Sequence, residues 1–312
     1  MNNNTDLPKG TLPDWVYVEQ VAFSGIIALI GTPGNILIIL VFSNSPEKSS
    51  TDYMVFAMAI SDLLGSIVCT TLNILRHIPV LWENIGSMWF CRAYDFFTSY
   101  TVTISAWVLG VVAIDRYMKT CRPLSDAFSA SRIKILCKAV YILVLVLLMP
   151  SFGVERFDVS TGACLLNDYE SVWSIFMYVI SFLCCVSYII TAVAYIRIAV
   201  ALGSRLRKKQ NRNLGMKENT IQASGLLQEQ KKVNRTTVIM FLITLINVFS
   251  VVLTYFGYLH AGDRLYLPEG VREVLGYTTH TTYLVTYIAN PILYIMMSSK
   301  FREGMRKLFQ KV

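Results

Sequence analysis

The stretch VEQVAFSGIIALIGTPGNILIILVF, residues 18–42, contains a single charged side chain, that of Glu19. A helix of about 20 residues crosses the hydrocarbon core of a membrane, so this stretch is long enough to span one. Six further apolar stretches follow it along the chain. Together the seven occupy residues 18–42, 53–78, 90–118, 133–152, 172–202, 233–259 and 271–297. The sequence therefore predicts an all-α membrane protein, a seven-transmembrane helix bundle that forms a single domain over residues 1–312.

The overall composition also indicates that lipid surrounds much of the chain. Of its 312 residues, 54% are hydrophobic and only 15% are charged. Soluble domains carry about 25% charged residues, and a soluble fold of this length could not enclose so much apolar surface. Gly, Ser, Thr and Pro interrupt several stretches, which membrane helices tolerate because neighbouring helices satisfy the freed backbone groups.

The basic residues predict the orientation, because positively charged segments stay on the cytoplasmic side. With the N-terminus outside, 22 Lys and Arg lie inside and 6 outside. We therefore expect a plasma-membrane protein with an extracellular N-terminus, residues 1–17, and a cytoplasmic third loop, residues 203–230. The net charge of +8 then indicates anionic membrane lipids, and not nucleic acid, as partners.

The two ends of the chain carry weaker signals. The beginning lacks a basic segment followed by a short apolar one, so the first span is expected to direct membrane insertion. The sequon Asn3-Asn4-Thr5 predicts glycosylation of Asn3, although a chance match in an Asn-rich tail is an alternative. Residues 299–309 place apolar side chains on one side and basic ones around them, which predicts a short amphipathic helix on the inner membrane surface. A frayed basic tail is the alternative.

Cysteine positions divide by side of the membrane. In this topology only Cys91, at the outer start of the third span, and Cys164, in the loop after the fourth, face an oxidising compartment. A disulfide between them is therefore predicted. No spacing of Cys and His indicates zinc, and no nucleophile is paired with a base, so neither a metal centre nor an enzyme is expected.

Ionisable residues inside spans are costly and therefore mark functional sites. Asp62 lies mid-membrane, and Asn35, Ser105 and Asn290 are the neighbours expected to form with it a polar cluster for a small cation or a proton. The alternative is a protonated carboxyl bonded within its own helix. At the inner end of the third span, Asp115-Arg116-Tyr117 could hold the arginine in one state and release it in another.

Five motifs occur in order, each on the expected span, and together they resemble the rhodopsin-like (class A) G-protein-coupled receptors, in particular a peptide-receptor-like or orphan member. The resemblance covers nearly the whole chain. The motifs are Gly34-Asn35, Ser61-Asp62-Leu63, Cys91 followed 25 residues later by Arg116 in Asp115-Arg116-Tyr117, Pro123-Leu124, and Asn290-Pro291-Ile292-Leu293-Tyr294.

The resemblance implies a role for each matching residue. Asp62, Asn35, Ser105 and Asn290 would form an allosteric sodium pocket, sodium being the only ion or cofactor implied. Asp115 and Arg116, with Tyr117 beside them, would form the lock and the contact for a heterotrimeric G protein. Leu124 would seat in the G protein, and Tyr195 and Tyr294 would stabilise the open state. Cys91 and Cys164 would form the family disulfide.

Several positions depart from the family pattern. Val248 and Ser250 stand where the sixth helix usually carries Trp and Pro, which puts the usual activation trigger in doubt. Tyr287 places a large ring where a small residue normally borders the sodium pocket, and Tyr141 and Ser187 also differ from the usual Trp and Pro.

The ligand class follows from what the outer half carries. Among the receptors that this sequence resembles, those for amines have Asp at the position of Thr98, and opsins carry the retinal-binding Lys at the position of Leu284. Neither a monoamine nor a covalently bound retinal is therefore favoured. Twelve acids against six bases on the outer side favour a cationic, neuropeptide-like peptide, although topology alone could produce acidic loops. A lipid, a non-amine small molecule or a transporter function are the alternatives. The pocket residues expected from helix position are Asn73, Arg76, Asp95, Thr98, Tyr255, His280 and Tyr283.

Overall fold

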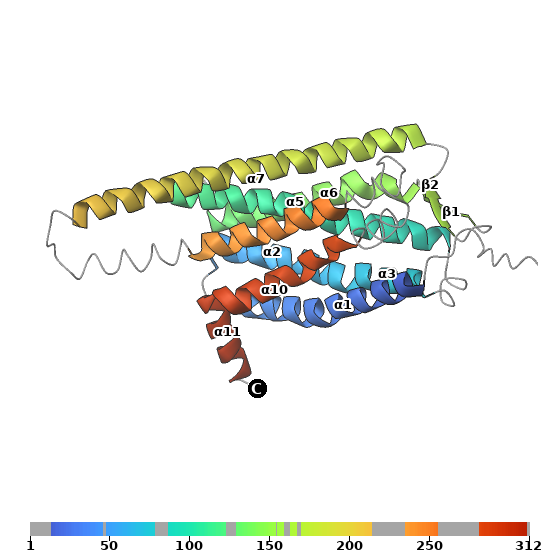
Figure 1. Ribbon diagram of the computed structural model, residues 1–312, viewed down its shortest axis with the longest axis horizontal. Helices are drawn as coiled ribbons and strands as arrows, with labels where there is room; N and C mark the ends of the chain where they lie inside the picture. Colours follow the sequence, from blue (N-terminus) through green and yellow to red (C-terminus); the bar gives the residue numbers. More distant parts are fainter. Residues whose placement is uncertain are drawn as a thin grey trace, which may run out of the picture.

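The computed structural model describes residues 14–45, 48–78, 87–122, 129–153, 155–158, 163–166, 170–213, 235–254 and 281–310. Helices account for most of these residues, and their long axes run roughly along the molecule (Figure 1). The first three spans are α1 (Asp14–Ser43), α2 (Ser50–Leu64) continued by η1 (Gly65–Cys69) and α3 (Thr70–Arg76), and α5 (Met88–Cys121).

The second half of the chain supplies four more spans and two short strands. They are α6 (Ala130–Leu148) continued by η3 (Met149–Gly153), β1 (Glu155–Asp158), β2 (Ala163–Leu166), α7 (Glu170–Asn213), the helix Arg235–Thr254, here called the sixth span, and η4 (Thr282–Val285) with α10 (Thr286–Met297). After them, α11 (Ser299–Phe309) turns away from the bundle. The predicted seven-helix bundle with a short eighth helix is confirmed.

The spans differ in length and hydropathy. Among the described residues, five helices are long and apolar enough to cross a membrane. The fourth, α6, has 19 residues but begins with three basic side chains, and the described part of the seventh, Thr282–Met297, is shorter. Long basic side chains at a helix end can extend toward the lipid headgroups, so α6 still fits a membrane.

Serine side chains cap the N-termini of four of the helices. Ser49 Oγ accepts a hydrogen bond from the backbone N–H of Asp52, whose carboxylate accepts one from Ser49 N at 2.7 Å, forming a capping box. Ser87, Ser129 and Ser298 cap α5, α6 and α11 in the same way from one side. Each cap satisfies a backbone donor that the helix leaves unpaired, which fixes where the helix starts.

The second span contains a π-helical turn, η1. Ordinary α-helical backbone precedes and follows it, and Gly65 at its start faces the ring of Tyr287 on α10. A π turn holds one more residue than the α-helical turn it replaces, and such turns are rare. Gly65 is required here because a Cβ atom would overlap that ring.

Two features of the structure add to the sequence prediction. The third loop, predicted over 203–230 to extend two helices at its ends, is helical as far as Asn213, because α7 continues well beyond the apolar stretch. Its last turns are rich in Leu, Arg, Lys and Gln, which are good helix formers. The antiparallel pair β1 and β2, with Phe157 opposite Cys164, was not predicted. It lies at the end of the bundle opposite α11 (Figure 1), and we call these the hairpin end and the α11 end.

Candidate functional site

A buried carboxyl lies at the centre of the bundle. Asp62 is 3% exposed, and Asn290 Nδ2 on α10 donates a hydrogen bond to it at 2.5 Å. They border a cavity of about 10 Å³, roughly the space of one water molecule. The cavity is lined by Met58, Asp62, Ser105, Leu109, Ile243, Asn247, Thr286, Ala289 and Asn290. The structure thus brings together Asp62, Ser105 and Asn290, and adds Asn247 and Thr286, which the sequence reasoning missed.

Asn35 takes a different position from the one predicted. Its side-chain amide donates to the backbone oxygens of Gly31, at 3.0 Å, and Tyr287, at 2.8 Å, and it does not line the cavity. Packing brings the Tyr287 carbonyl within reach of α1, and Asn35 therefore joins α1 to α10. Its role in the structure is to hold two helices together beside the carboxyl.

The cavity beside Asp62 is small because Tyr287 fills part of the surrounding space. This ring is fully buried, covers Gly65 and shares a 2.7 Å hydrogen bond with Thr101 Oγ1. The remaining oxygens still suit a small cation, since Asn290 Oδ1 is buried and has no hydrogen-bond partner among the described residues. With the Asp62 carboxylate and the Ser105 hydroxyl, it offers oxygen ligands of the kind that hard cations prefer.

The second site lies near the α11 end, where one carboxylate is shared by two cations. Arg116 donates to Asp115 Oδ2 through Nη2 at 2.5 Å and Nε at 3.1 Å, and also bonds the Thr51 hydroxyl. Lys119 Nζ lies 3.2 Å from Asp115 Oδ1, which also accepts a hydrogen bond from Ser50 at 2.9 Å. Asp115 is fully buried. The structure is therefore in the locked arrangement, with the arginine turned toward its neighbour.

The other residues predicted to take part in coupling are not brought together here. Tyr195 and Tyr294 are both buried but not bonded to each other. The Tyr195 ring contacts Phe241 at 5.2 Å between centroids, and the Tyr294 hydroxyl lies 3.6 Å from Met240 Sδ. Tyr117 is half-buried against the core beside the lock. Leu124 lies outside the described residues.

A polar network occupies the hairpin end between α1, α3 and α5. Asn73 donates to Ser24 at 2.8 Å and to Gln20 at 3.4 Å, and accepts from the Tyr94 hydroxyl at 3.2 Å. The Arg76 guanidinium lies 5.0 Å from the centre of the Tyr94 ring. Of the predicted pocket residues, Asn73 and Arg76 therefore meet around Tyr94, which the sequence reasoning missed.

Three more predicted pocket residues lie on α5 and η4. Thr98 and Tyr283 share a hydrogen bond of 3.3 Å across the bundle. Asp95 Oδ2 is buried and has no hydrogen-bond partner among the described residues. The last two, Tyr255 and His280, lie outside those residues.

Comparison with known proteins places the chain in a family. Residues 34–294 match the family described as 7 transmembrane receptor (rhodopsin family). The chain belongs to this family. It is a multi-pass membrane receptor, which confirms the predicted class and the prediction that it is not an enzyme.

Peptide receptors are among the relatives that this receptor is similar to. It is 24% identical to the allatostatin-A receptor of Bombyx mori, over 98% of its own length and 84% of the relative's. It is 23% identical to the neuromedin-K receptor of Rattus norvegicus, over 96% and 65% respectively, so it spans just under two thirds of that protein. It is 24% identical to the galanin-like G-protein coupled receptor npr-9 of Caenorhabditis elegans, over 89% and 70%.

Hydroxyl groups join the sixth and seventh spans of this receptor near Ser250, where the family usually has proline. The backbone oxygen of Ser250 accepts from Thr254 Oγ1 and from Thr282 Oγ1, each at 3.0 Å. The two threonine hydroxyls are themselves 3.0 Å apart. One turn nearer the α11 end, the Tyr188 hydroxyl of α7 donates to Asn247 Oδ1 at 2.8 Å. Side-chain hydrogen bonds therefore fix the sixth span at the level where the usual Trp and Pro are replaced.

Cys91, one of the two cysteines of the predicted disulfide, is disulfide-bonded in the structure. It lies at the start of α5. Cys69, Cys121, Cys137, Cys184 and Cys185 are free. The backbone of Cys164 lies in β2 at the same end of the bundle. The pairing of Cys91 with Cys164 stays a prediction, and Asn3 lies outside the described residues.

Proposed function

We propose that this receptor sits in the plasma membrane with its N-terminus outside, binds a peptide at the hairpin end and activates a heterotrimeric G protein at the α11 end. The observation that carries the proposal is the lock of Asp115 with Arg116, a buried charge pair at one end of a helix that reaches the other end. Such a pair is costly to bury and therefore suits a group that changes partners. The 22 basic residues expected on this side support its cytoplasmic location.

Activation follows from the contacts that the resting arrangement makes. Release of Arg116 from Asp115 and Thr51 would free its guanidinium for the G protein. An outward movement of the sixth span would draw Met240 and Phe241 away from Tyr294 and Tyr195, which lets the two hydroxyls approach. The ligand can drive this change only through a higher affinity for the open state.

The peptide assignment rests on the relatives and on charge. The allatostatin-A, neuromedin-K and galanin-like receptors carry peptide names, and the outer side of this chain has twice as many acids as bases. Acidic surfaces steer cationic ligands. Buried Asp95, with an unpaired oxygen beside the network of Asn73 and Arg76, supplies an anionic group inside the expected pocket. A peptide response that survives neutralisation of Asp95, Asp158 and Asp168 together would contradict acidic steering.

Sodium is proposed as an allosteric ion at Asp62, with Ser105 and Asn290 as further oxygen ligands. Among the described residues, the Asp62 carboxyl accepts a hydrogen bond from the neutral amide of Asn290, and a bound cation would neutralise its negative charge. The cavity leaves little room for accompanying water, so a weak effect is expected. Sodium should lower agonist affinity in the parent receptor and lose this effect in Asp62→Asn. An unchanged sodium dependence in the variant would exclude the site.

Two covalent modifications and one lipid contact complete the proposal. Cys91 is proposed to pair with Cys164, which would attach the hairpin to the start of α5. Asn3 would carry a glycan on the outside, and the basic face of α11 would lie on anionic lipid. Mass spectrometry of peptides under non-reducing conditions tests the first two directly.

Guanine-nucleotide exchange on a co-expressed G protein tests the function itself. Exchange should rise with the parent receptor and a stimulating peptide, and disappear with Arg116→Ala at equal surface expression. Arg306→Ala on α11 is the matched control, because it removes an arginine at the same end of the bundle that is not part of the lock. Equal exchange with Arg116→Ala and the parent would contradict the proposal.

A further inference from the structure

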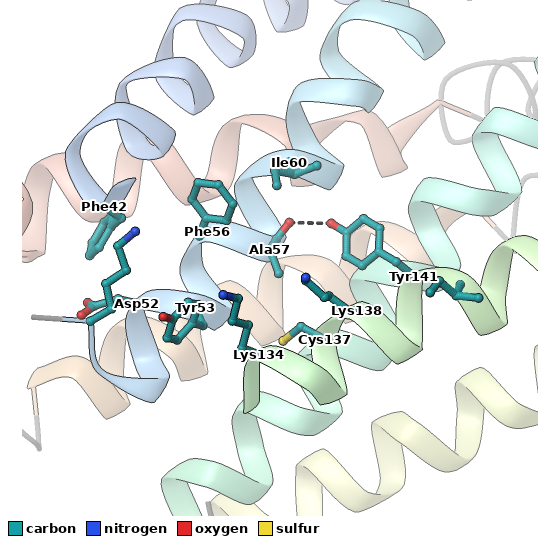
Figure 2. A pocket seen from close by; sticks show the side chains of 12 residues that line it. Phe42, Asp52, Tyr53, Phe56, Ala57, Ile60, Lys134, Cys137, Lys138 and Tyr141 are labelled. Carbon is teal, nitrogen blue, oxygen red and sulfur yellow. Dashed lines mark hydrogen bonds between the residues drawn. The ribbon is translucent and has the colours of Figure 1, made fainter. Parts of the chain in front are cut away.

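A groove opens on the side of the bundle between α1, α2 and α6, near the α11 end (Figure 2). Its volume is about 490 Å³, within the range of cavities that hold small-molecule ligands. Its lining includes no residue of the cavity beside Asp62, and neither Asp115 nor Arg116. The groove is therefore separate from both sites.

The floor of the groove is apolar and follows the helices into the membrane. Phe56, Ala57 and Ile60 of α2 face Tyr141 and Ile142 of α6, and the Tyr141 hydroxyl is occupied by a 2.6 Å hydrogen bond to the Ala57 oxygen. Seven residues of helix separate Tyr53 from Ile60, which is about 10 Å along the axis. This floor suits a hydrocarbon chain that runs parallel to the spans.

The mouth of the groove is positively charged. Lys134 and Lys138 are one turn apart on the same face of α6, and both extend over the groove beside Tyr53 and Ala57 (Figure 2). Lys134 Nζ lies 5.7 Å from the centre of the Tyr53 ring, a cation–π contact that holds the ammonium over the opening. Lys48 also lines the groove.

The charge of the groove is not neutralised by the described part of the protein. Among the described residues, Asp52 is the only acid that lines the groove, and it already bonds Lys300 Nζ at 2.6 Å and caps α2. The ion pairs among the described residues do not include Lys48, Lys134 or Lys138. Three ammonium groups therefore line an apolar groove whose one described carboxylate, that of Asp52, is already paired with Lys300.

We propose that this groove binds one anionic phospholipid of the adjacent leaflet, its phosphate between Lys134, Lys138 and Lys48 and one acyl chain against Ile60, Tyr141 and Ile142. A zwitterionic lipid would match the floor but not the charge, and a soluble phosphate would match the charge but not the floor. Only a lipid with a net negative headgroup uses both. The site is separate from the ligand and G-protein sites of the proposed function.

Photo-crosslinking locates the lipid directly. The full chain is placed in phosphatidylcholine nanodiscs that contain a trace of phosphatidylserine carrying a diazirine in one acyl chain. After illumination, adducts are expected within residues 53–60 and 137–142, and a phosphatidylcholine probe should label these segments far less. Glycerophosphoserine, which lacks acyl chains, should not compete.

Two variants separate charge from shape. Lys134→Gln with Lys138→Gln should reduce labelling by the phosphatidylserine probe about 25-fold, since each lysine near an anionic headgroup contributes about fivefold. Arg306→Gln with Lys307→Gln on α11 is the matched control and should leave labelling of the groove unchanged. Ile142→Trp keeps the lysines but fills the floor, and should also abolish labelling there.

Three outcomes would overturn the proposal. Equal labelling of the groove by the two probes would remove the role of the headgroup charge. Undiminished labelling in the double lysine variant would do the same. Displacement of both probes by cholesterol, with the lysine variant unaffected, would identify the groove as a sterol site instead.

Discussion

Removal of Lys119 should strengthen the lock and lower the activity of the receptor. Lys119 Nζ lies 3.2 Å from Asp115 Oδ1 and hydrogen-bonds Ser50, while Arg116 holds Oδ2 of the same carboxylate. When Arg116 leaves, Lys119 is the charged partner that remains for the buried carboxylate among the described residues, so its pairing contributes more to the released state than to the locked one. In the locked state its charge also repels the guanidinium of Arg116. Lys119→Met removes both effects, so Arg116 should stay bound more often.

The size of the effect follows from the exposure of the lysine. Its side chain is 37% exposed, so solvent screens the pair and its contribution resembles that of a partly exposed salt bridge, about 1 kcal/mol. That is about a fivefold shift toward the locked state. Ligand-independent nucleotide exchange should therefore fall about fivefold, and the peptide concentration for half-maximal exchange should rise by a similar factor.

The assay is nucleotide exchange on a co-expressed G protein at matched surface expression, at low and high salt. Lys119→Arg should behave like the parent, because it keeps the charge, and Lys307→Met on α11 controls for loss of a surface lysine. If Lys119→Met raises basal exchange, Lys119 stabilises the locked state instead and the reasoning is refuted.

Three other substitutions test neighbouring parts of the structure. Thr51→Val removes a hydrogen-bond partner of Arg116 and should raise basal exchange several-fold, with no rise refuting the resting state assigned here. Gly65→Ala should lower the melting temperature of the purified receptor, at a cost of about 1–3 kcal/mol for an overpacked site, and Tyr287→Ser in the same chain should restore it. Tyr188→Phe breaks a bond between α7 and the sixth span, worth about 0.6 kcal/mol, so basal exchange should rise two- to threefold; a fall would count against that bond as a restraint.

The spans could be predicted from the sequence because their signal is local. Hydrophobic length located all seven, and the spacing of Phe301 and Met305 located α11. The membrane also restricts where a carboxylate can lie, so Asp62 could be singled out from its surroundings alone. Its partner Asn290 followed from a motif and lies within hydrogen-bond distance.

The remaining details depend on how helices pack, which no local pattern encodes. Asn35 bonds a backbone oxygen on another helix, 252 residues away in the chain. Thr254 and Thr282 are ordinary residues of an apolar stretch until packing brings their hydroxyls within 3.0 Å. The pairing of Lys119 with Asp115 could have been found, since the two are four residues apart on one helix.

The π turn η1 gives the second span an unusual tolerance to changes in length. Loss of one residue within 65–69 would convert this turn to ordinary α-helix and leave Thr70–Arg76 facing the same neighbours. Loss of one residue from α3 would instead rotate the remainder of the helix by about 100°. Arg76 would then turn away from Tyr94. Natural variation in chain length within this span should therefore be confined to the five residues of the π turn.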